Sequence, residues 1–244
     1  MTKMVFWHGW AMSPAVWTPL IQKLSSQCQG EFDFQAEPLP GYGDGIAENA
    51  MPVSGWVDSM MSKVTSPIIL CGWSMGAMMA LDASNRYPEK IQKLVLFGAT
   101  PCFINRENWQ LGQIPEVAEQ FKEGVQKKGK AVVKRFITLF NQNDVHSKDV
   151  VRNLASLDSP SDDVLLKGLD FLHQADYRND IETIKQPVLL IHGRNDPLMP
   201  VSAAEWLAEK MPNTFLKVID DAAHAPLLSY TDECAGLIRE FLCQ

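Results

Sequence analysis

A G-x-S-x-G pentapeptide at residues 72–76 carries the clearest chemical signal in the sequence. It follows an apolar run and opens a segment dense in Met, Ala and Leu, and such a strand–turn–helix setting presents a nucleophilic serine. Its two glycines allow a turn too sharp for larger residues, which exposes the Ser74 hydroxyl at the end of the strand. The N-terminus of the following helix favours developing negative charge. The alternative is a glycine-rich turn with a capping serine.

A serine hydroxyl needs a base to become a nucleophile at neutral pH, and histidine is the usual one. His224 lies on the loop after the last expected strand, at the same end of the sheet as Ser74. His146 and His173 fall in a helical segment, where a packed or solvated role fits them better. His192 ends a strand and is expected to be structural. We therefore expect His224 to be the base.

The acid that orients this base should follow a strand and lie between the serine and the histidine in the chain. Asp196 does so, and it would hold the imidazole tautomer and stabilise the imidazolium. Asp220 and Asp221 are too close in sequence to the histidine to reach its ring easily. Asp176 and Asp180 remain alternatives, and Asp196 itself has the alternative role of a turn-forming residue.

The negative charge that develops on the reacting oxygen needs two backbone N–H donors. Met75, the residue after the nucleophile, is expected to supply one of them. The turn His8-Gly9-Trp10 follows the first expected strand, and the Trp10 amide is expected to supply the other. Losing one such donor costs about 3–4 kcal/mol of transition-state stabilisation. The alternative is that residues 8–10 form an ordinary turn.

Short apolar runs that end in glycine or in polar turns must position these residues. Such runs are typical of strands buried on both faces of a parallel sheet. Helical patterns alternate with them, so we expect an α/β protein with a mostly parallel, doubly wound sheet. The expected strands are residues 4–7, 67–71, 94–97, 187–191 and 215–219, and the expected helices are residues 74–86, 203–211 and 231–242.

Residues 103–177 break this alternation, because they show helical periodicity and no convincing strand. One apolar helical face there consists of Val133, Phe136, Ile137 and Phe140. We expect one domain over residues 1–244, with a helical cap at residues 103–180 inserted between two strands and lying over the site. The alternative is a group of extra helices with no role at the site.

The bulk properties exclude several classes of protein. The formal net charge of −7 disfavours nucleic acid as a partner. No apolar run is long enough to cross a bilayer and no secretory signal is evident, so we expect a cytoplasmic protein, which we take to be a monomer. The five cysteines include no C-x-x-C pair, which disfavours disulfides and a zinc site. The proposed chemistry needs neither a metal nor a cofactor.

Charge is distributed unevenly along the chain. Residues 122–152 contain eight lysines and arginines and three acidic residues, a net charge of +5, whereas the rest of the chain carries −12. One flank of a single expected helix carries Lys127, Lys130 and Lys134, and its outer face carries Lys128 and Arg135. Lys148 and Arg152 form an i, i+4 pair. Such a surface would attract an anionic partner, and a solvated helix face is the alternative.

Together these motifs resemble those of the pimeloyl-[acyl-carrier-protein] methyl ester esterases of biotin synthesis, which have the α/β-hydrolase fold. The resemblance covers nearly the whole chain. Trp10, Trp73 and the stretch at residues 99–103, with Trp109 following, carry the narrower resemblance, because the other motifs are shared across the fold. These relatives usually have an N-terminal β-hairpin before the strand that leads to residues 8–10, and we expect this hairpin to be missing here. The matching motifs are residues 8–10, 72–76, 87–91, 192–196 and 223–226.

The resemblance implies a serine carboxylesterase that converts the methyl ester of pimeloyl-acyl carrier protein to the free acid and methanol, without a cofactor. Because acyl carrier proteins are acidic, it also implies cations that dock the carrier. The candidates for docking are Lys127, Lys130, Lys134, Arg135, Lys148 and Arg152. The alternatives are a generic short-chain carboxylesterase, a C–C hydrolase or menaquinone-pathway lyase on the same fold, and a binding protein without activity.

Overall fold

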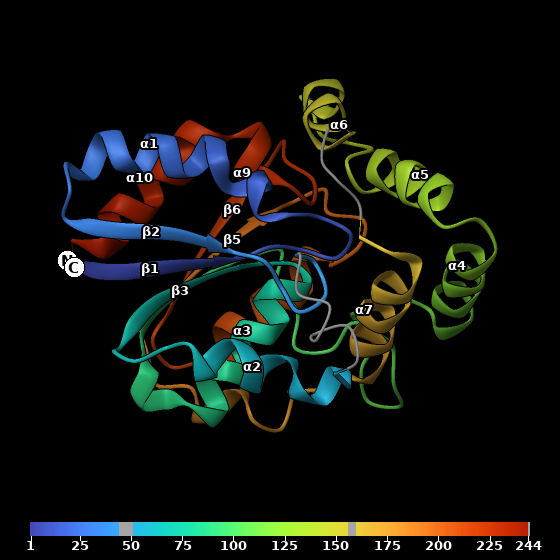
Figure 1. The fold of residues 1–244 in the computed structure, drawn as a ribbon, viewed down its shortest axis with the longest axis horizontal. Helices are drawn as coiled ribbons and strands as arrows, with labels where there is room; N and C mark the ends of the chain where they lie inside the picture. Colours follow the sequence, from blue (N-terminus) through green and yellow to red (C-terminus); the bar gives the residue numbers. More distant parts are fainter. Residues whose placement is uncertain (44–50, 156–159, 244) are drawn as a thin grey trace.

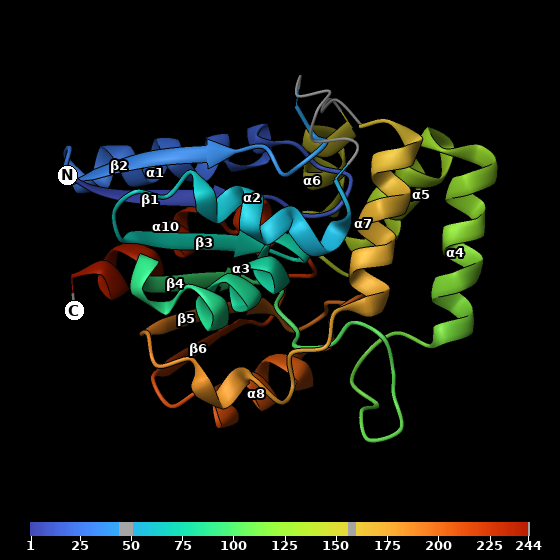
Figure 2. The same cartoon turned by 60° about the horizontal axis from the view of Figure 1, so that its bottom comes forward.

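The computed structural model describes residues 1–43, 51–155 and 160–243. Within these ranges, six strands form one sheet in the order β2-β1-β3-β4-β5-β6, and every neighbouring pair is parallel. The strands are β1 (Thr2–Trp7), β2 (Phe32–Glu37), β3 (Ile68–Trp73), β4 (Ile91–Phe97), β5 (Val188–Gly193) and β6 (Thr214–Ile219). Their C-terminal ends therefore meet at one edge, and the expected parallel sheet is confirmed (Figure 2).

Helices cover both faces of this sheet (Figures 1 and 2). One face carries α1 (Thr18–Cys28), α9 (Pro226–Ser229) and α10 (Thr231–Leu242), and the other carries α2 (Trp56–Ser62), α3 (Met75–Arg86) and α8 (Val201–Lys210). Short 3-10 turns join them: η1 (Pro14–Trp17), η3 (Val53–Gly55), η4 (Pro88–Lys90) and η5 (Ile181–Thr183). This double cover explains why all six residues of β3 are buried and why its sequence is apolar nearly throughout.

The edge strand β2 was not among the strands expected from the apolar runs. Its sequence, FDFQAE, alternates apolar and polar residues, and all six are half-buried. This is the pattern of a strand that packs one face against the core and leaves the other in water. The search for continuous apolar runs missed it because only strands covered on both faces show such runs.

In the part of the chain that the structure describes, four helices lie between β4 and β5, beyond the edge where the strands end (Figure 2). They are α4 (Pro115–Lys128), α5 (Lys130–Phe140), α6 (Ser147–Ala155) and α7 (Asp162–Gln174). The expected apolar face on α5 is present, since Val133, Ile137 and Phe140 are all buried. Both chain termini lie at the opposite end of the sheet (Figure 1).

The expectation of one helix carrying the cations from residue 127 to residue 135 is wrong. Gly129 has φ of 44° and ψ of −118°, and it ends α4 and precedes α5. This positive φ favours glycine, and a Cβ atom at this position would also lie 2.4 Å from the end of the exposed Asp162 side chain, which would have to move. Lys127 and Lys128 therefore belong to α4, whereas Lys134 and Arg135 belong to α5.

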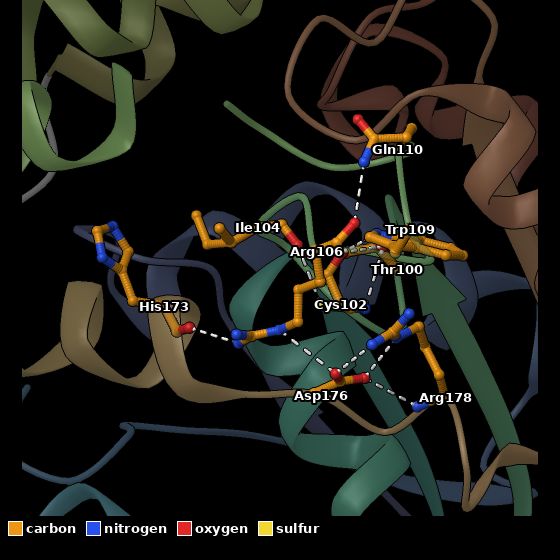
Figure 3. Close-up of polar contacts among 9 residues, drawn as sticks. All are labelled: Thr100, Cys102, Ile104, Arg106, Trp109, Gln110, His173, Asp176 and Arg178. Carbon is orange, nitrogen blue, oxygen red and sulfur yellow. Dashed lines mark hydrogen bonds and ion pairs between the residues drawn. The ribbon is translucent and has the colours of Figure 1, made fainter. Parts of the chain in front are cut away.

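The two stems that join these helices to the sheet are fastened together at Asp176 (Figure 3). Arg106 lies 3.3 Å from the Asp176 carboxylate and donates a 2.9 Å hydrogen bond to the His173 carbonyl. Arg178 donates two hydrogen bonds of 2.8 and 2.7 Å to the same carboxylate. These hydrogen bonds hold the pKa of Asp176 below its ordinary value, against the effect of partial burial. Charge-assisted bonds thus connect the outgoing stem to the returning one.

Candidate active site

Ser74 occupies a strained turn between β3 and α3, with φ of 57°. A Cβ atom on Gly72 would lie 2.5 Å from the Gly76 carbonyl oxygen, and one on Gly76 would lie 2.3 Å from the Trp7 carbonyl oxygen. Both positions therefore require glycine, because the backbones of the turn and of β1 come too close for any side chain. The G-x-S-x-G pattern is the local requirement of a turn that lifts the serine off the end of β3.

Asp196 and His224 are joined by a short hydrogen bond in the interior. Nδ1 of His224 lies 2.7 Å from Oδ2 of Asp196, and both residues are buried. The other carboxylate oxygen accepts from the backbone N–H groups of Leu198 and Met199, at 2.9 and 3.0 Å. Asp196 thus fixes the ring so that Nδ1 carries the proton and Nε2 is left to accept one.

Two opposing effects act on the pKa of Asp196. Burial raises it, but the charge of the neighbouring His224 ring and the hydrogen bonds to the carboxylate outweigh burial, so the pKa lies below its ordinary value. The carboxylate is therefore ionised at neutral pH, which suits a group that stabilises an imidazolium. Of the acids weighed in the sequence, Asp196 is the one bonded to His224, since Asp176 pairs with Arg178.

Ser74 and His224 line the same small pocket, together with Gly9, Trp10 and Trp73. In the described part of the chain, no hydrogen bond joins the Ser74 hydroxyl to the His224 ring. Catalytic hydrogen bonds are often long in unliganded enzymes and tighten when substrate binds. The structure therefore gathers the three predicted residues at the C-terminal edge of the sheet, with one of the two connecting hydrogen bonds already formed.

The two expected amide donors flank this pocket. Met75 is the first residue of α3, directly after the nucleophile. Trp10 lies on the turn after β1, where its indole N–H donates a 2.8 Å hydrogen bond to the Leu165 carbonyl of α7. The Trp10 ring also packs edge-on against Phe121 and Phe136. The side chain of Trp10 is thus held by the inserted helices, and Trp10 lines the same pocket as Ser74.

The loop that carries His224 is held by the segment between α5 and α6. The buried carboxylate of Asp144 accepts a 3.0 Å hydrogen bond from the Ala223 N–H, across 79 residues of sequence. The His224 N–H donates to the Phe140 carbonyl at 3.4 Å, and the Phe140 ring packs edge-on against the imidazole. Sequence reasoning missed Asp144, because a lone aspartate in a polar stretch carries no signal of a partner so far away.

A larger cavity adjoins the serine pocket. It has a volume of about 210 Å³ and an almost wholly apolar lining, and it lies among α4, α5 and α7. Five residues line both the serine pocket and this cavity: Trp10, Phe103, Phe136, Leu172 and Leu198. Val117 and Leu139 also line it, and each is about half exposed. The arrangement places an apolar cavity among the inserted helices next to the pocket that Ser74 lines.

Comparison with known proteins agrees with this geometry. Residues 3–229 match the family model of the α/β hydrolase fold. A pimeloyl-[acyl-carrier protein] methyl ester esterase of Aromatoleum aromaticum is 35% identical, over 97% of this chain and 96% of that protein. One of Nitrosomonas europaea is 32% identical, over 94% and 91%. The chain belongs to this esterase family of α/β hydrolases. The resemblance found in the motifs is confirmed, and the protein is a carboxylic ester hydrolase.

Solved structures support the fold of this esterase. An esterase from Exiguobacterium antarcticum superposes with a TM-score of 0.88 at 18% identity, covering 100% of this chain and 92% of the other. A bromoperoxidase from Bacillus anthracis superposes with a TM-score of 0.86 at 21% identity, over the same shares. Likeness at this level of identity speaks for the fold alone, and the expected α/β-hydrolase fold is confirmed.

Exposed cations of the esterase lie on α4, α5 and α6. Lys127 pairs with Glu123, and Arg152 pairs with Asp149. The Lys130 side chain lies outside the described residues. Within the described ranges, no carboxylate pairs with the exposed side chains of Lys128, Lys134, Arg135 and Lys148.

The described ranges contain no group of three or more His, Cys, Asp or Glu side chains placed to hold a metal ion. They also contain no helix of the length and apolarity that crossing a membrane requires. The remaining histidines have other partners. His192 shares a 2.7 Å hydrogen bond with the Met199 carbonyl, and burial lowers its pKa. His146 packs against Tyr230, and His173 lies 3.7 Å from Glu119.

Proposed function

We propose that this esterase hydrolyses the methyl ester of pimeloyl-acyl carrier protein, with Ser74 as nucleophile, His224 as base and Asp196 as the orienting acid. The observation that carries the catalytic assignment is the 2.7 Å hydrogen bond between Asp196 and His224 beside the pocket of Ser74. The substrate follows from relatives that carry this activity in their names and match nearly the whole chain. The reaction serves biotin synthesis.

The reaction proceeds by two acyl transfers. Nε2 of His224 takes the Ser74 proton as the serine oxygen attacks the ester carbonyl, and the amides of Trp10 and Met75 stabilise the oxyanion. His224 then protonates the departing methoxide, so methanol leaves and an acyl-enzyme remains. Water, deprotonated by His224, attacks this acyl-enzyme and frees the carboxylic acid. The thioester at the far end of the pimeloyl chain stays intact.

In this proposal, residues 103–180 form a helical cap that lies over the site of Ser74. Its support is the 210 Å³ apolar cavity among α4, α5 and α7, which shares walls with the serine pocket. An apolar acyl arm gains free energy by leaving water for such a cavity. The cavity therefore accommodates the acyl arm while the methyl ester lies at Ser74.

Exposed cations on the cap dock the acidic carrier. Charge complementarity of this kind raises the association rate and fixes the orientation of a partner more than it adds affinity. The pairs that Lys127 and Arg152 form are on the surface, so little free energy is lost when the carrier replaces their carboxylates. The docking residues proposed are Lys127, Lys130, Lys134, Arg135, Lys148 and Arg152. The monomeric state and the cytoplasmic location stay predictions.

The test is methanol release from purified pimeloyl-acyl carrier protein methyl ester, alongside genetic complementation of a strain blocked at methyl ester removal. The wild-type enzyme is expected to release methanol and restore growth, and Ser74→Ala is expected to do neither. Hydrolysis of p-nitrophenyl butyrate without methanol release from the carrier-bound ester would instead favour a generic carboxylesterase. Turnover of no ester would point to the C–C hydrolase or lyase, and failure of a fluorophosphonate to label Ser74 would point to a binding protein.

The ionic-strength dependence of the same assay tests the docking surface. Raising the salt concentration is expected to increase KM for the carrier-bound ester and to leave hydrolysis of p-nitrophenyl butyrate unchanged, because salt screens long-range attraction between the proteins. Equal salt responses of the two substrates would rule out docking through these cations.

A further inference from the structure

The turn that carries the Trp10 amide contains a strained residue. Ala11 has φ of 61°, in the left-handed region that residues with a Cβ atom rarely occupy, and it is buried. A non-glycine residue keeps such a conformation only when its surroundings hold it there. The identity of what holds Ala11 therefore bears on where the neighbouring amide points.

The Tyr42 hydroxyl holds Ala11. It accepts a hydrogen bond of 3.1 Å from the Ala11 N–H, across 31 residues of sequence. The Tyr42 ring also meets His8 edge-on, with ring centroids 4.7 Å apart. Tyr42 itself is fixed by its backbone N–H, which donates to the Leu39 carbonyl at 2.9 Å. A single side chain from the loop after β2 thus contacts both ends of the turn after β1.

His8 joins the same two loops through its ring. Nε2 accepts a 3.2 Å hydrogen bond from the Leu39 N–H, and Nδ1 lies 2.9 Å from the Gly9 carbonyl oxygen, to which it donates. A neutral ring with the proton on Nδ1 satisfies both contacts. Burial lowers the pKa of His8 from 6.5 to about 4, although the hydrogen bond to Gly9 opposes this, so the ring is neutral at physiological pH.

The turn held in this way touches the nucleophile. A Cβ atom on Gly9 would lie 3.3 Å from the Ser74 Cβ, so the backbone of the turn runs directly against the serine. The Trp10 indole is hydrogen-bonded to the Leu165 carbonyl. The backbone of residues 9–11 is therefore held at two neighbouring points, by the Trp10 side chain and by the Ala11 amide.

We propose that Tyr42 is a positioning residue for the oxyanion hole: its hydroxyl keeps Ala11 in the left-handed conformation that turns the Trp10 N–H toward the oxygen of the substrate. This inference rests on the proposed function of Trp10 as an oxyanion donor. Tyr42 does not touch the reacting atoms, and it acts through the backbone of residues 9–11.

Tyr42→Phe tests the proposal by removing one oxygen atom. We expect kcat for p-nitrophenyl butyrate to fall about three- to tenfold with KM unchanged, the range that one net hydrogen bond covers. An aryl trifluoromethyl ketone forms a hemiketal oxyanion with Ser74 and reports on the oxyanion hole directly. Its affinity should fall by the same factor. Tyr87→Phe is the matched control, since it loses a hydroxyl hydrogen bond to Asp58 at the far end of α3 and should leave both quantities unchanged.

Ala11→Gly supplies the rescue. Glycine adopts φ of 61° without strain, so the turn no longer depends on the tyrosine hydroxyl. The double variant Ala11→Gly with Tyr42→Phe should recover most of the activity and ketone affinity lost in Tyr42→Phe. If Tyr42 has only a structural role, Tyr42→Phe should lower the melting temperature, but kcat and ketone affinity should not fall together and recover in the double variant.

The outcomes separate this inference from the proposed function. Unchanged kcat and ketone affinity in Tyr42→Phe, in an enzyme that Ser74→Ala inactivates, would overturn the role of Tyr42 and leave the esterase mechanism standing. Full turnover by Ser74→Ala would overturn the mechanism itself.

Discussion

Two loops at the C-terminal edge of the sheet present proposed catalytic groups, and the two loops differ in the parts of the molecule that hold them. The backbone and the His8 ring of the turn at residues 8–11 are bonded to residues 39–42, within the α/β core, and only the Trp10 indole of this described turn is bonded to the inserted helices, at Leu165. The loop at residues 220–224 is bonded to residues 140–145, which belong to the inserted helices. The comparison indicates that the inserted helices help to hold the backbone of the His224 loop, whereas they contact the turn at residues 8–11 through the Trp10 side chain.

The order of the strands explains the first arrangement. β1 and β2 are neighbours in a parallel sheet, so the loops that follow them leave at the same edge and lie side by side. No comparable rule brings Asp144 to Ala223, since Asp144 follows a helix that is not part of the sheet. The backbone of the proposed oxyanion turn is thus supported by the neighbouring strand loop, and the insertion contacts this turn through the Trp10 side chain, whereas the insertion bonds the backbone of the His224 loop directly.

The largest expected effect is on the histidine side. Asp196→Asn should keep the fold and lower kcat by about 10⁴-fold, because an amide in place of the carboxylate favours the wrong imidazole tautomer. Steady-state kinetics with p-nitrophenyl butyrate measures it. Asp220→Asn is the control, since Asp220 is an exposed partner of Arg194, and its kcat should match that of the wild type.

The next largest expected effect is on the free energy of unfolding, and it involves His8 in the turn at residues 8–11. His8 has a folded-state pKa of about 4 against 6.5 for the unfolded chain, so the unfolded chain takes up a proton first as pH falls. The free energy of unfolding should therefore decrease from about pH 6.5 and stop responding to His8 below about pH 4, by about 3 kcal/mol in all.

Urea unfolding at pH 7 and at pH 4.5 tests this prediction about His8. His8→Asn should be less stable than the wild type at pH 7 and should lose less stability on acidification. If wild type and His8→Asn lose the same free energy of unfolding between pH 7 and pH 4.5, the assignment of this pH dependence to the His8 ring is contradicted.

Asp144→Ala tests the link between the cap and the histidine loop. Loss of the carboxylate leaves the buried Ala223 N–H without its acceptor, and we expect kcat to fall about tenfold or more, with a smaller change in KM. Asp144→Asn keeps an acceptor oxygen and should recover part of this loss. The control is Asn141→Ala in the same segment, whose side chain donates to the Ile137 carbonyl instead. An equal loss of kcat in the control would mean that any disturbance of the segment suffices.

The smallest effect concerns the outer surface of the same helices. Lys134→Glu and Arg135→Glu should each raise KM for the carrier-bound ester by up to about fivefold, the range of an exposed charge pair, and leave hydrolysis of p-nitrophenyl butyrate unchanged. Lys185→Glu is the control, because Lys185 precedes β5 at the opposite edge of the sheet. A matching rise in KM for the control would assign the effect to net charge alone.

Local pattern in the sequence was enough to predict the buried strands and the turn that carries Ser74. Strands covered on both faces need continuous apolar runs, and the close approach of backbones at residues 72 and 76 needs glycine. Both features can therefore be recognised from residues that are adjacent in the sequence. The three catalytic candidates followed from the loops that such strands place at one edge. The edge strand β2 was not predicted, because a half-buried strand shows only a weak alternation of apolar and polar residues.

Tertiary structure alone decided where the chain turns back on itself and which distant groups meet. Gly129 divides the basic segment into two helices by adopting φ of 44°, and the charge pattern around Gly129 does not show that the chain turns there. Tyr42 reaches Ala11 across 31 residues, and Asp144 reaches Ala223 across 79. A hydrogen bond of this kind depends on the relative placement of whole elements, which local residue pattern does not encode.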